Sequence, residues 1–97
     1  FQKVLQDAGD KLAVVFFTAE WCGPCKTIGL AFEMHSQKPE NADVIFRKVD
    51  VDDASDISEF CGIAAMPTFV FFKQVNEIDR FQGKNENTLE EKISKHR

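Results

Sequence analysis

The chain has 97 residues, of which 43% are hydrophobic and 29% charged, with a net charge of −4. This length is enough for one domain with a buried core, and ten phenylalanines can fill much of that core. The charges are spread without a basic stripe, which argues against a nucleic-acid partner. No apolar run approaches the roughly 20 residues of a membrane span or resembles a signal peptide. Three cysteines cannot all pair, which excludes a secreted disulfide scaffold and favours a cytoplasmic protein.

The first predicted element is a helix that is already under way at residue 1. Phe1, Val4, Leu5 and Ala8 fall on one of its faces, and a glycine follows. No preceding residue can cap the free N–H groups of such a helix. We therefore expect a single domain over residues 1–97 that has been trimmed at its N-terminus.

Four apolar runs rich in β-branched and aromatic residues predict strands, and the last two are close enough to form a hairpin. The runs are residues 12–17, 44–49, 67–72 and 75–81. Helical patterns lie between the first three strands, so we expect crossover connections and a sheet that is at least partly parallel. The order of elements predicts one α/β domain.

Three further helices are predicted from capping and stop signals. One runs for about 13 residues through Lys38, before Pro39 breaks it. A short one is capped by the acidic stretch 50–56 and stopped at Gly62. The last opens with a capping box, Thr88-Leu89-Glu90-Glu91, and points Leu89 and Ile93 inward.

The segment that carries chemistry is Trp21-Cys22-Gly23-Pro24-Cys25-Lys26, which follows a buried strand and opens a helix. A helix N-terminus offers free N–H groups and partial positive charge, and both stabilise a thiolate at Cys22. The thiolate is the nucleophile of thiol–disulfide exchange. Cys25, one helical turn later, can attack the resulting mixed disulfide and release the reduced substrate. The segment therefore predicts redox activity.

Two other interpretations of this cysteine pair remain open. A zinc site needs four ligands, and the other candidates, Cys61, His35 and His96, show no second paired spacing. Inert core cysteines are the second alternative, although Trp, Gly and Pro around the pair indicate an exposed loop. We expect no metal, with His35 on the protein surface and no calcium site in the acidic stretch 50–56, which lacks the EF-hand spacing.

The chain resembles the thioredoxin family, and animal cytosolic thioredoxins in particular. The resemblance rests on four segments in the family's order: Ala8-Gly9-Asp10-Lys11-Leu12, Trp21 to Lys26, Val49 to Asp53, and Met66-Pro67-Thr68-Phe69. It implies the thioredoxin fold, a central mixed sheet flanked by helices, with the family's first strand missing upstream of Phe1. It also implies a cytoplasmic, monomeric protein disulfide reductase that serves cell redox homeostasis. Such a protein binds no cofactor and receives electrons from a thioredoxin reductase.

The resemblance further assigns roles around the catalytic pair, Cys22 and Cys25. Pro67 would be a cis-proline beside the disulfide, and Met66 would offer backbone hydrogen bonds to a substrate strand. Trp21 and Gly83 would line the substrate groove, while Gly23-Pro24 matches the reductase branch rather than the isomerase branch. From the residues alone, a trans Pro67 at the start of a strand would be preferred, and Trp21 could be a packing residue as well as part of the groove.

Three positions depart from the family. Phe16 stands where the family buries an Asp beneath the second cysteine, so the general base is missing and Lys48 lacks that partner. Leu30 replaces a proline that kinks the helix in the family. The loop at 37–43 looks slightly longer than in the animal proteins that the chain resembles. Because general-base assistance is worth roughly 10²–10⁴-fold, we expect reduced turnover.

The loss of the buried Asp keeps a second function open, a thioredoxin-fold binding or regulatory module with weak turnover. Retention of both cysteines, Lys26 and Pro67 argues against it. Lys26 could steer acidic partners or simply be exposed. We expect Cys61 to be half-buried, with a regulatory or dimer-forming thiol as the alternative.

Overall fold

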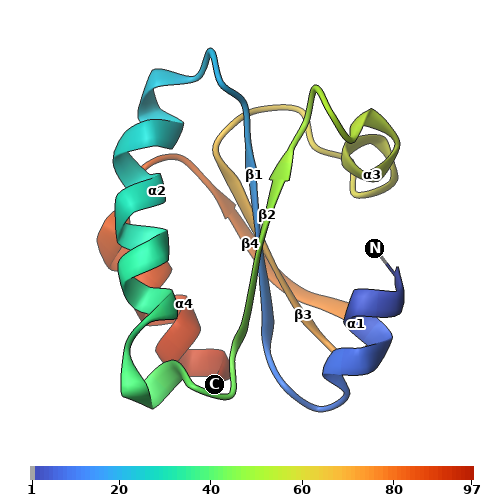
Figure 1. Cartoon of the computed structure of the whole chain (residues 1–97), viewed down its shortest axis with the longest axis vertical. Helices are drawn as coiled ribbons and strands as arrows, with labels where there is room; N and C mark the ends of the chain where they lie inside the picture. The colour runs from blue at the N-terminus through green and yellow to red at the C-terminus, as the bar shows by residue number, and fades with distance from the viewer. Residues whose placement is uncertain (1) are drawn as a thin grey trace.

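The computed structural model describes residues 2–97 and arranges them as a four-stranded sheet between two layers of helices (Figure 1). The strands are β1 (Ala13–Thr18), β2 (Ile45–Asp50), β3 (Thr68–Lys73) and β4 (Asn76–Gln82). The helices are α1 (Gln2–Ala8), α2 (Gly23–Ser36), α3 (Ser55–Phe60) and α4 (Glu86–His96), with a 3₁₀ turn η1 (Pro39–Asn41). The face predicted for α1 includes Phe1, which lies outside the described residues. Within residues 2–97, no helix has the length and apolar character of a membrane span.

The sheet is mixed, with the strand order β2-β1-β3-β4. Strands β1 and β2 run parallel, with Phe16 opposite Lys48, and α2 forms the crossover between them. Strand β3 is antiparallel to both β1 and β4, and the predicted β3–β4 hairpin is confirmed. The prediction of a partly parallel sheet is therefore also confirmed.

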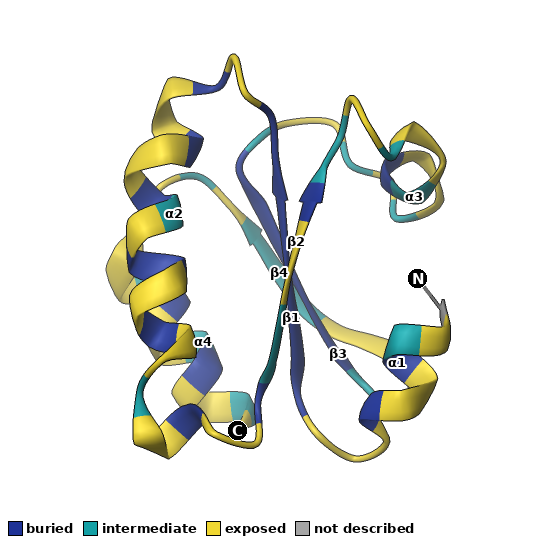
Figure 2. Ribbon diagram, in the orientation of Figure 1, coloured by how far each residue is buried: buried dark blue, intermediate teal, exposed yellow. Residues whose placement is uncertain are grey.

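Helices α2 and α4 cover one face of the sheet, and α1 and α3 lie on the other (Figures 1 and 2). Strand β1 is buried along its whole length because both of its faces are covered. Its Val14 and Phe16 belong to the core on the α2 side, while Val15 and Phe17 belong to the core on the opposite side. This alternation brings position 16 beneath the helix that carries Cys25.

The predicted C-terminus of the second helix is wrong by two residues. Helix α2 ends at Ser36 rather than Lys38. Lys38 has an extended backbone, with φ −71° and ψ 136°, because the residue before a proline is disfavoured in the helical region.

The predicted helix caps of α3 and α4 are wrong. Helix α4 begins at Glu86, and its cap is Asn85, whose side-chain oxygen accepts the Thr88 N–H at 3.1 Å. Thr88 is therefore inside the helix rather than its cap, although Leu89 and Ile93 are buried as predicted. Helix α3 has Ala54 at its N-cap and no side-chain hydrogen bond there, so the acidic stretch does not cap it.

Helix α4 is tied to the sheet by a carboxylate on β4. Asp79 Oδ2 lies 2.8 Å from Lys92 Nζ and 2.8 Å from His96 Nε2. Hydrogen bonding to Lys92, and then to His96, lowers the pKa of Asp79 from 3.8 to about 2.

The hairpin turn between β3 and β4 has an uncommon backbone. Gln74 and Val75 have positive φ angles of 52° and 71°, as the two central residues of a type I′ turn require. Glycine or asparagine adopts this conformation readily, whereas a β-branched residue such as Val75 is strained there. The turn occupies Val75, so β4 begins one residue later than predicted.

Candidate active site

The two cysteines of the motif are joined by a disulfide across the first turn of α2. Cys22 is the N-cap residue, with φ −89° and ψ 105°, and its Sγ accepts the Cys25 N–H at 3.2 Å. The helix starts at Gly23, so Pro24 sits in its first turn, where the missing N–H of proline costs no hydrogen bond. The predicted loop therefore ends at Cys22, and Cys25 is already helical.

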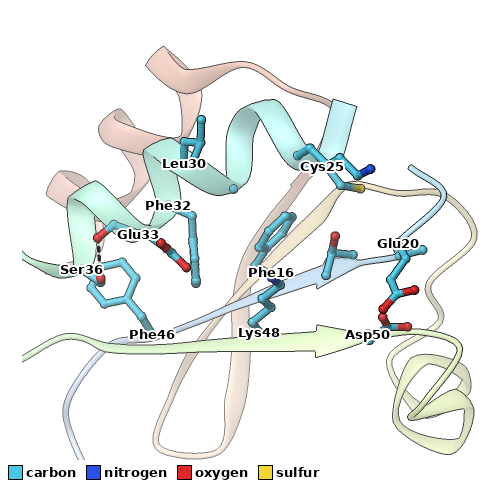
Figure 3. A pocket seen from close by; sticks show the side chains of 14 residues that line it. Phe16, Glu20, Cys25, Leu30, Phe32, Glu33, Ser36, Phe46, Lys48 and Asp50 are labelled. Atoms are coloured by element: carbon cyan, nitrogen blue, oxygen red, sulfur yellow. Dashed lines mark hydrogen bonds between the residues drawn. The ribbon is translucent and has the colours of Figure 1, made fainter. Parts of the chain in front are cut away.

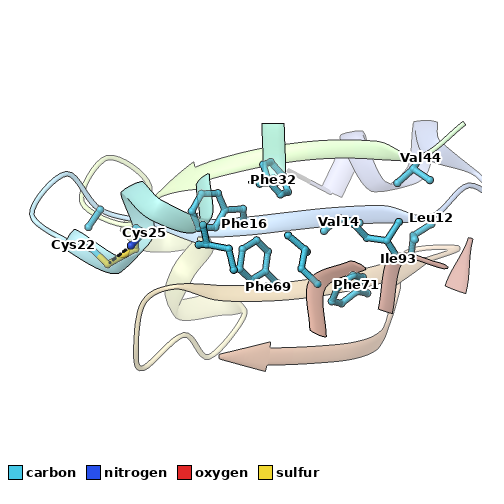
Figure 4. Close-up of a cluster of buried hydrophobic side chains, with 13 residues drawn as sticks. Leu12, Val14, Phe16, Cys22, Cys25, Phe32, Val44, Phe69, Phe71 and Ile93 are labelled. Carbon is cyan, nitrogen blue, oxygen red and sulfur yellow. Dashed lines mark hydrogen bonds between the residues drawn. A yellow bond between two sulfur atoms is a disulfide. The ribbon is translucent and has the colours of Figure 1, made fainter. Parts of the chain in front are cut away.

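Both sulfur-bearing residues are nearly covered, at 5% exposure for Cys22 and 2% for Cys25 (Figure 4). They belong to the same apolar cluster as Phe16 and Phe69. The first-turn N–H groups lie beside Cys22 and favour a negative charge on its sulfur when the disulfide is reduced. Cys25 is held at 5.3 Å between Cα atoms, a separation that lets its sulfur reach the sulfur of Cys22.

Trp21 stands beside the disulfide and is 67% exposed. Its Nε1 donates a hydrogen bond of 2.9 Å to Asp52 Oδ2. The Asp52 N–H donates in turn to Asp50 Oδ1 at 2.9 Å, which orders the loop after β2. In the sequence Asp52 stands out only as part of an acidic run, so its contact with Trp21 was not predicted. The one sequence feature that could have drawn attention to Asp52 is the Val49 to Asp53 segment, which is part of the family resemblance.

The bond between Met66 and Pro67 is cis, as the resemblance implied, so the trans alternative is wrong. Pro67 O accepts the Gly83 N–H at 2.9 Å, and Gly83 has φ +104°, a conformation that favours glycine. Met66 packs against the apolar cluster that contains both cysteines. The structure thus brings Met66, Pro67 and Gly83 together, and it leaves Gly23, Pro24 and Lys26 exposed.

Phe16 occupies the space beneath Cys25 and is 1% exposed. Its ring stacks on Phe69 at 4.8 Å between centroids and contacts Phe32 at 5.2 Å. Phe69 stacks in turn on Phe81 at 4.9 Å, and Phe32 meets Phe46 at 5.3 Å. These five rings form an aromatic row that crosses the sheet from β4 to β2.

Gly29 on α2 faces this row. A Cβ atom on Gly29 would stand 3.5 Å from the Phe16 ring, an ordinary van der Waals distance, so the ring packs directly against this turn of α2. The next residue, Leu30, is 73% exposed. Lys48 is exposed, and its side chain forms no hydrogen bond or ion pair with residues 2–97.

His35 is buried at 4% exposure, which corrects the expected surface position. It follows Ile28 and Phe32 at helical spacing, so it lies on the buried face of α2. Burial and then the charge of Lys38 lower the pKa of His35. No group of three or more potential metal ligands occurs within residues 2–97.

Cys61 is half-buried, as expected, and burial raises the pKa of its thiol. Its backbone oxygen accepts a hydrogen bond of 2.7 Å from Arg80 Nη2, which ties the end of α3 to β4.

A disulfide at a helix N-terminus that follows a central strand, in a fold that also holds a cis-proline, defines a dithiol–disulfide oxidoreductase. The thioredoxin family's sequence model matches residues 1–95. Thioredoxin of Ictalurus punctatus is 54% identical over 97 residues, covering 100% of this chain and 91% of the relative. Thioredoxin of Homo sapiens is 49% identical over 94 residues, covering 97% and 88% respectively. The crystal structure of Fasciola hepatica thioredoxin superposes with a TM-score of 0.95 at 42% identity, covering 99% of this chain and 90% of that one.

The chain belongs to the thioredoxin family. It has the thioredoxin fold, and its Cys22–Cys25 pair makes it a protein-disulfide oxidoreductase that acts as a dithiol–disulfide reductase. The binding-module alternative is not favoured.

Proposed function

We propose that Cys22 is the nucleophile of this reductase and Cys25 the resolving residue. The Cys22 thiolate attacks a substrate disulfide and forms a mixed disulfide. Cys25 then attacks the Cys22 sulfur, and the reduced substrate leaves. The observation that carries this order is the position of Cys22 as the N-cap of α2, where the first-turn N–H groups favour its thiolate.

The substrate strand would bind across the surface formed by Trp21, Met66, Pro67 and Gly83. The exposed Trp21 ring, fixed by its hydrogen bond to Asp52, provides an apolar contact. Met66, before the cis-proline, offers its backbone groups to an extended chain. Gly23 and Pro24 shape the turn between the cysteines, and Lys26 adds a positive charge at the edge of the substrate-binding surface.

Electrons would reach the disulfide from a thioredoxin reductase, with no cofactor bound by this chain. We place the protein in the cytoplasm as a monomer, with a single domain over residues 1–97, where it contributes to electron transport and cell redox homeostasis. Its substrates are proteins with accessible disulfides. Because Phe16 cannot accept a proton, we expect slower turnover than a chain with a buried carboxylate at that position.

The test is NADPH consumption coupled through a thioredoxin reductase, with a protein disulfide as substrate. We expect the parent to turn over and Cys22→Ser to be inactive. Cys25→Ser should accumulate a mixed disulfide that can be isolated by mass spectrometry. Cys61→Ser is the matched control and should retain activity. An active Cys22→Ser variant would contradict the assignment of the nucleophile.

A further inference from the structure

A cavity of about 810 Å³ lies on the inner side of Cys25, between α2 and the edge of the sheet formed by β1 and β2 (Figure 3). Its apolar wall includes Phe16, Phe32 and Phe46. Its charged residues come from the turn after β1, from α2 and from β2, while β1 itself contributes none; they are Glu20, Lys26, Glu33, Lys48 and Asp50. Cys25 lines this cavity and Cys22 does not, so the resolving cysteine faces a solvent route of its own. The volume is ample for several waters.

Resolution requires Cys25 to lose a proton, and the ring beneath it cannot take that proton. Phe16, Phe32 and Phe46 have no proton acceptor, and the cationic side chains of Lys26 and Lys48 are donors only. The acceptors within the cavity are therefore its three carboxylates.

Two of the three carboxylates are less suited to accept this proton, one because of its position and the other because it already accepts a hydrogen bond. Glu33 lies at the far end of the cavity, beside Ser36 and Phe46 (Figure 3). It is eight residues beyond Cys25, roughly 12 Å along the helix axis. Asp50 is at the near end, but its Oδ1 accepts the Asp52 N–H.

Glu20 meets the remaining requirements. It is an exposed residue in the turn between β1 and α2, at the Cys25 end of the cavity, and its carboxylate points toward Asp50 (Figure 3). Within residues 2–97 it forms no hydrogen bond or ion pair, so its oxygens are free to bind water.

We propose that Glu20 accepts the Cys25 proton, relayed by water in this cavity, as the mixed disulfide is resolved. This rests on the proposed order of attack. The Cys25 S–H proton passes through water to the Glu20 carboxylate, and the thiolate attacks the Cys22 sulfur. The bond from Cys22 to the substrate sulfur breaks, and that sulfur leaves as a thiolate with the electron pair. The dithiol is thereby oxidised by two electrons, the substrate disulfide is reduced by two, and Glu20 returns its proton to solvent.

The experiment is a single turnover of reduced protein with an aromatic disulfide whose thiolate is coloured. Attack by Cys22 releases the first thiolate, and resolution by Cys25 releases the second. Rates of both are measured across the neutral pH range for the parent and Glu20→Gln. Glu33→Gln is the matched control, since it makes the same change at the far end of the same cavity.

We expect Glu20→Gln to leave the first release unchanged and to slow the second about 10-fold, less than the 10²–10⁴-fold of a base in direct contact. The pH profile of the second release should move to higher pH. Added imidazole should accelerate that release in Glu20→Gln and not in the parent, because the cavity is open to solvent. Glu33→Gln should behave as the parent.

The proposal is overturned if Glu20→Gln and Glu33→Gln behave alike, if imidazole gives no rescue, or if Asp50→Asn produces the loss instead. A parent that releases no first thiolate would overturn the proposed function, and with it this inference. A failure of the proposed function would therefore appear in the first thiolate release, and a failure of the Glu20 proposal in the second.

Discussion

Replacing Phe16 by Asp is the most informative perturbation of this chain. The change adds the carboxyl that could act as a general base beneath Cys25, but it lowers stability by removing a buried ring. The ring is 1% exposed and contacts both Phe69 and Phe32. Loss of a buried phenylalanine side chain costs about 3–5 kcal/mol. A domain of this size has roughly 5–15 kcal/mol of stability in total, so Phe16→Asp should be folded but marginal at acidic pH, where the new carboxyl is protonated.

The stability deficit of Phe16→Asp should also depend on pH. Burial raises the pKa of a carboxyl above its unfolded value near 3.9. Between those two pKa values the folded variant binds more protons than the unfolded chain, so its stability falls as pH rises. Each unit of pKa shift corresponds to about 1.4 kcal/mol, and a shift of two to three units adds about 3–4 kcal/mol to the deficit at neutral pH.

The assay is urea unfolding followed by circular dichroism, on oxidised parent, Phe16→Asp and Phe16→Asn, from about pH 4 to about pH 8. Phe16→Asn is the matched control, because it removes the same ring without adding an ionisable group. We expect both variants to lose similar stability at the acidic end and only Phe16→Asp to weaken further toward neutral pH. If the two variants track each other at every pH, or neither is less stable than the parent, the reasoning is refuted.

Three other substitutions test separate parts of the fold by the same unfolding assay. Asp79→Asn should cost about 1–2 kcal/mol at pH 7, because a pKa lowered from 3.8 to about 2 marks a carboxylate that is stabilised in the folded state. That stability is present above the unfolded pKa and is lost as pH falls toward 2. An equal deficit of Asp79→Asn at pH 7 and near pH 2 would therefore contradict a stabilising role for the Asp79 carboxylate. Val75→Gly should raise stability by about 1 kcal/mol by relieving the positive φ of a β-branched residue, whereas Val75→Ala should gain less; a loss of stability in Val75→Gly would count against a strained turn. Asn85→Ala should cost about 1 kcal/mol through loss of the α4 cap, and the control Thr88→Ala should cost less. A larger loss of stability in Thr88→Ala than in Asn85→Ala would support the capping box predicted from the sequence.

Much of the fold could be predicted from the sequence because the strong signals are local. The unbroken apolar run at 12–17 marks a strand covered on both faces, and it is the fully buried β1. The cysteine motif after that strand located the dithiol. The helix caps were predicted less well, since several polar residues near each helix start can cap it and backbone position selects one of them. At α4 that residue is Asn85 rather than Thr88.

The site residues that the sequence did not reveal depend on tertiary contacts. Asp52 reaches Trp21 across 31 positions of sequence, and no local pattern encodes that hydrogen bond. The cavity beside Cys25 has the same origin, since it is bounded by β1, β2 and α2 together. His35 is different, because its helical spacing from Ile28 and Phe32 could have predicted burial.

The aromatic row has a consequence for how this chain can change by mutation. Phe16 is its central ring, with Phe69 and Phe81 on one side and Phe32 and Phe46 on the other. A single substitution to Asp removes the ring that packs against both Phe69 and Phe32, so that only the Phe32–Phe69 contact, at 5.9 Å between centroids, still joins the two sides. Return to an acidic residue therefore becomes favourable only after neighbouring side chains have changed as well. The same packing means that a carboxyl at position 16 would have to be accommodated by its aromatic neighbours, whereas the proposed route through Glu20 leaves this packing intact.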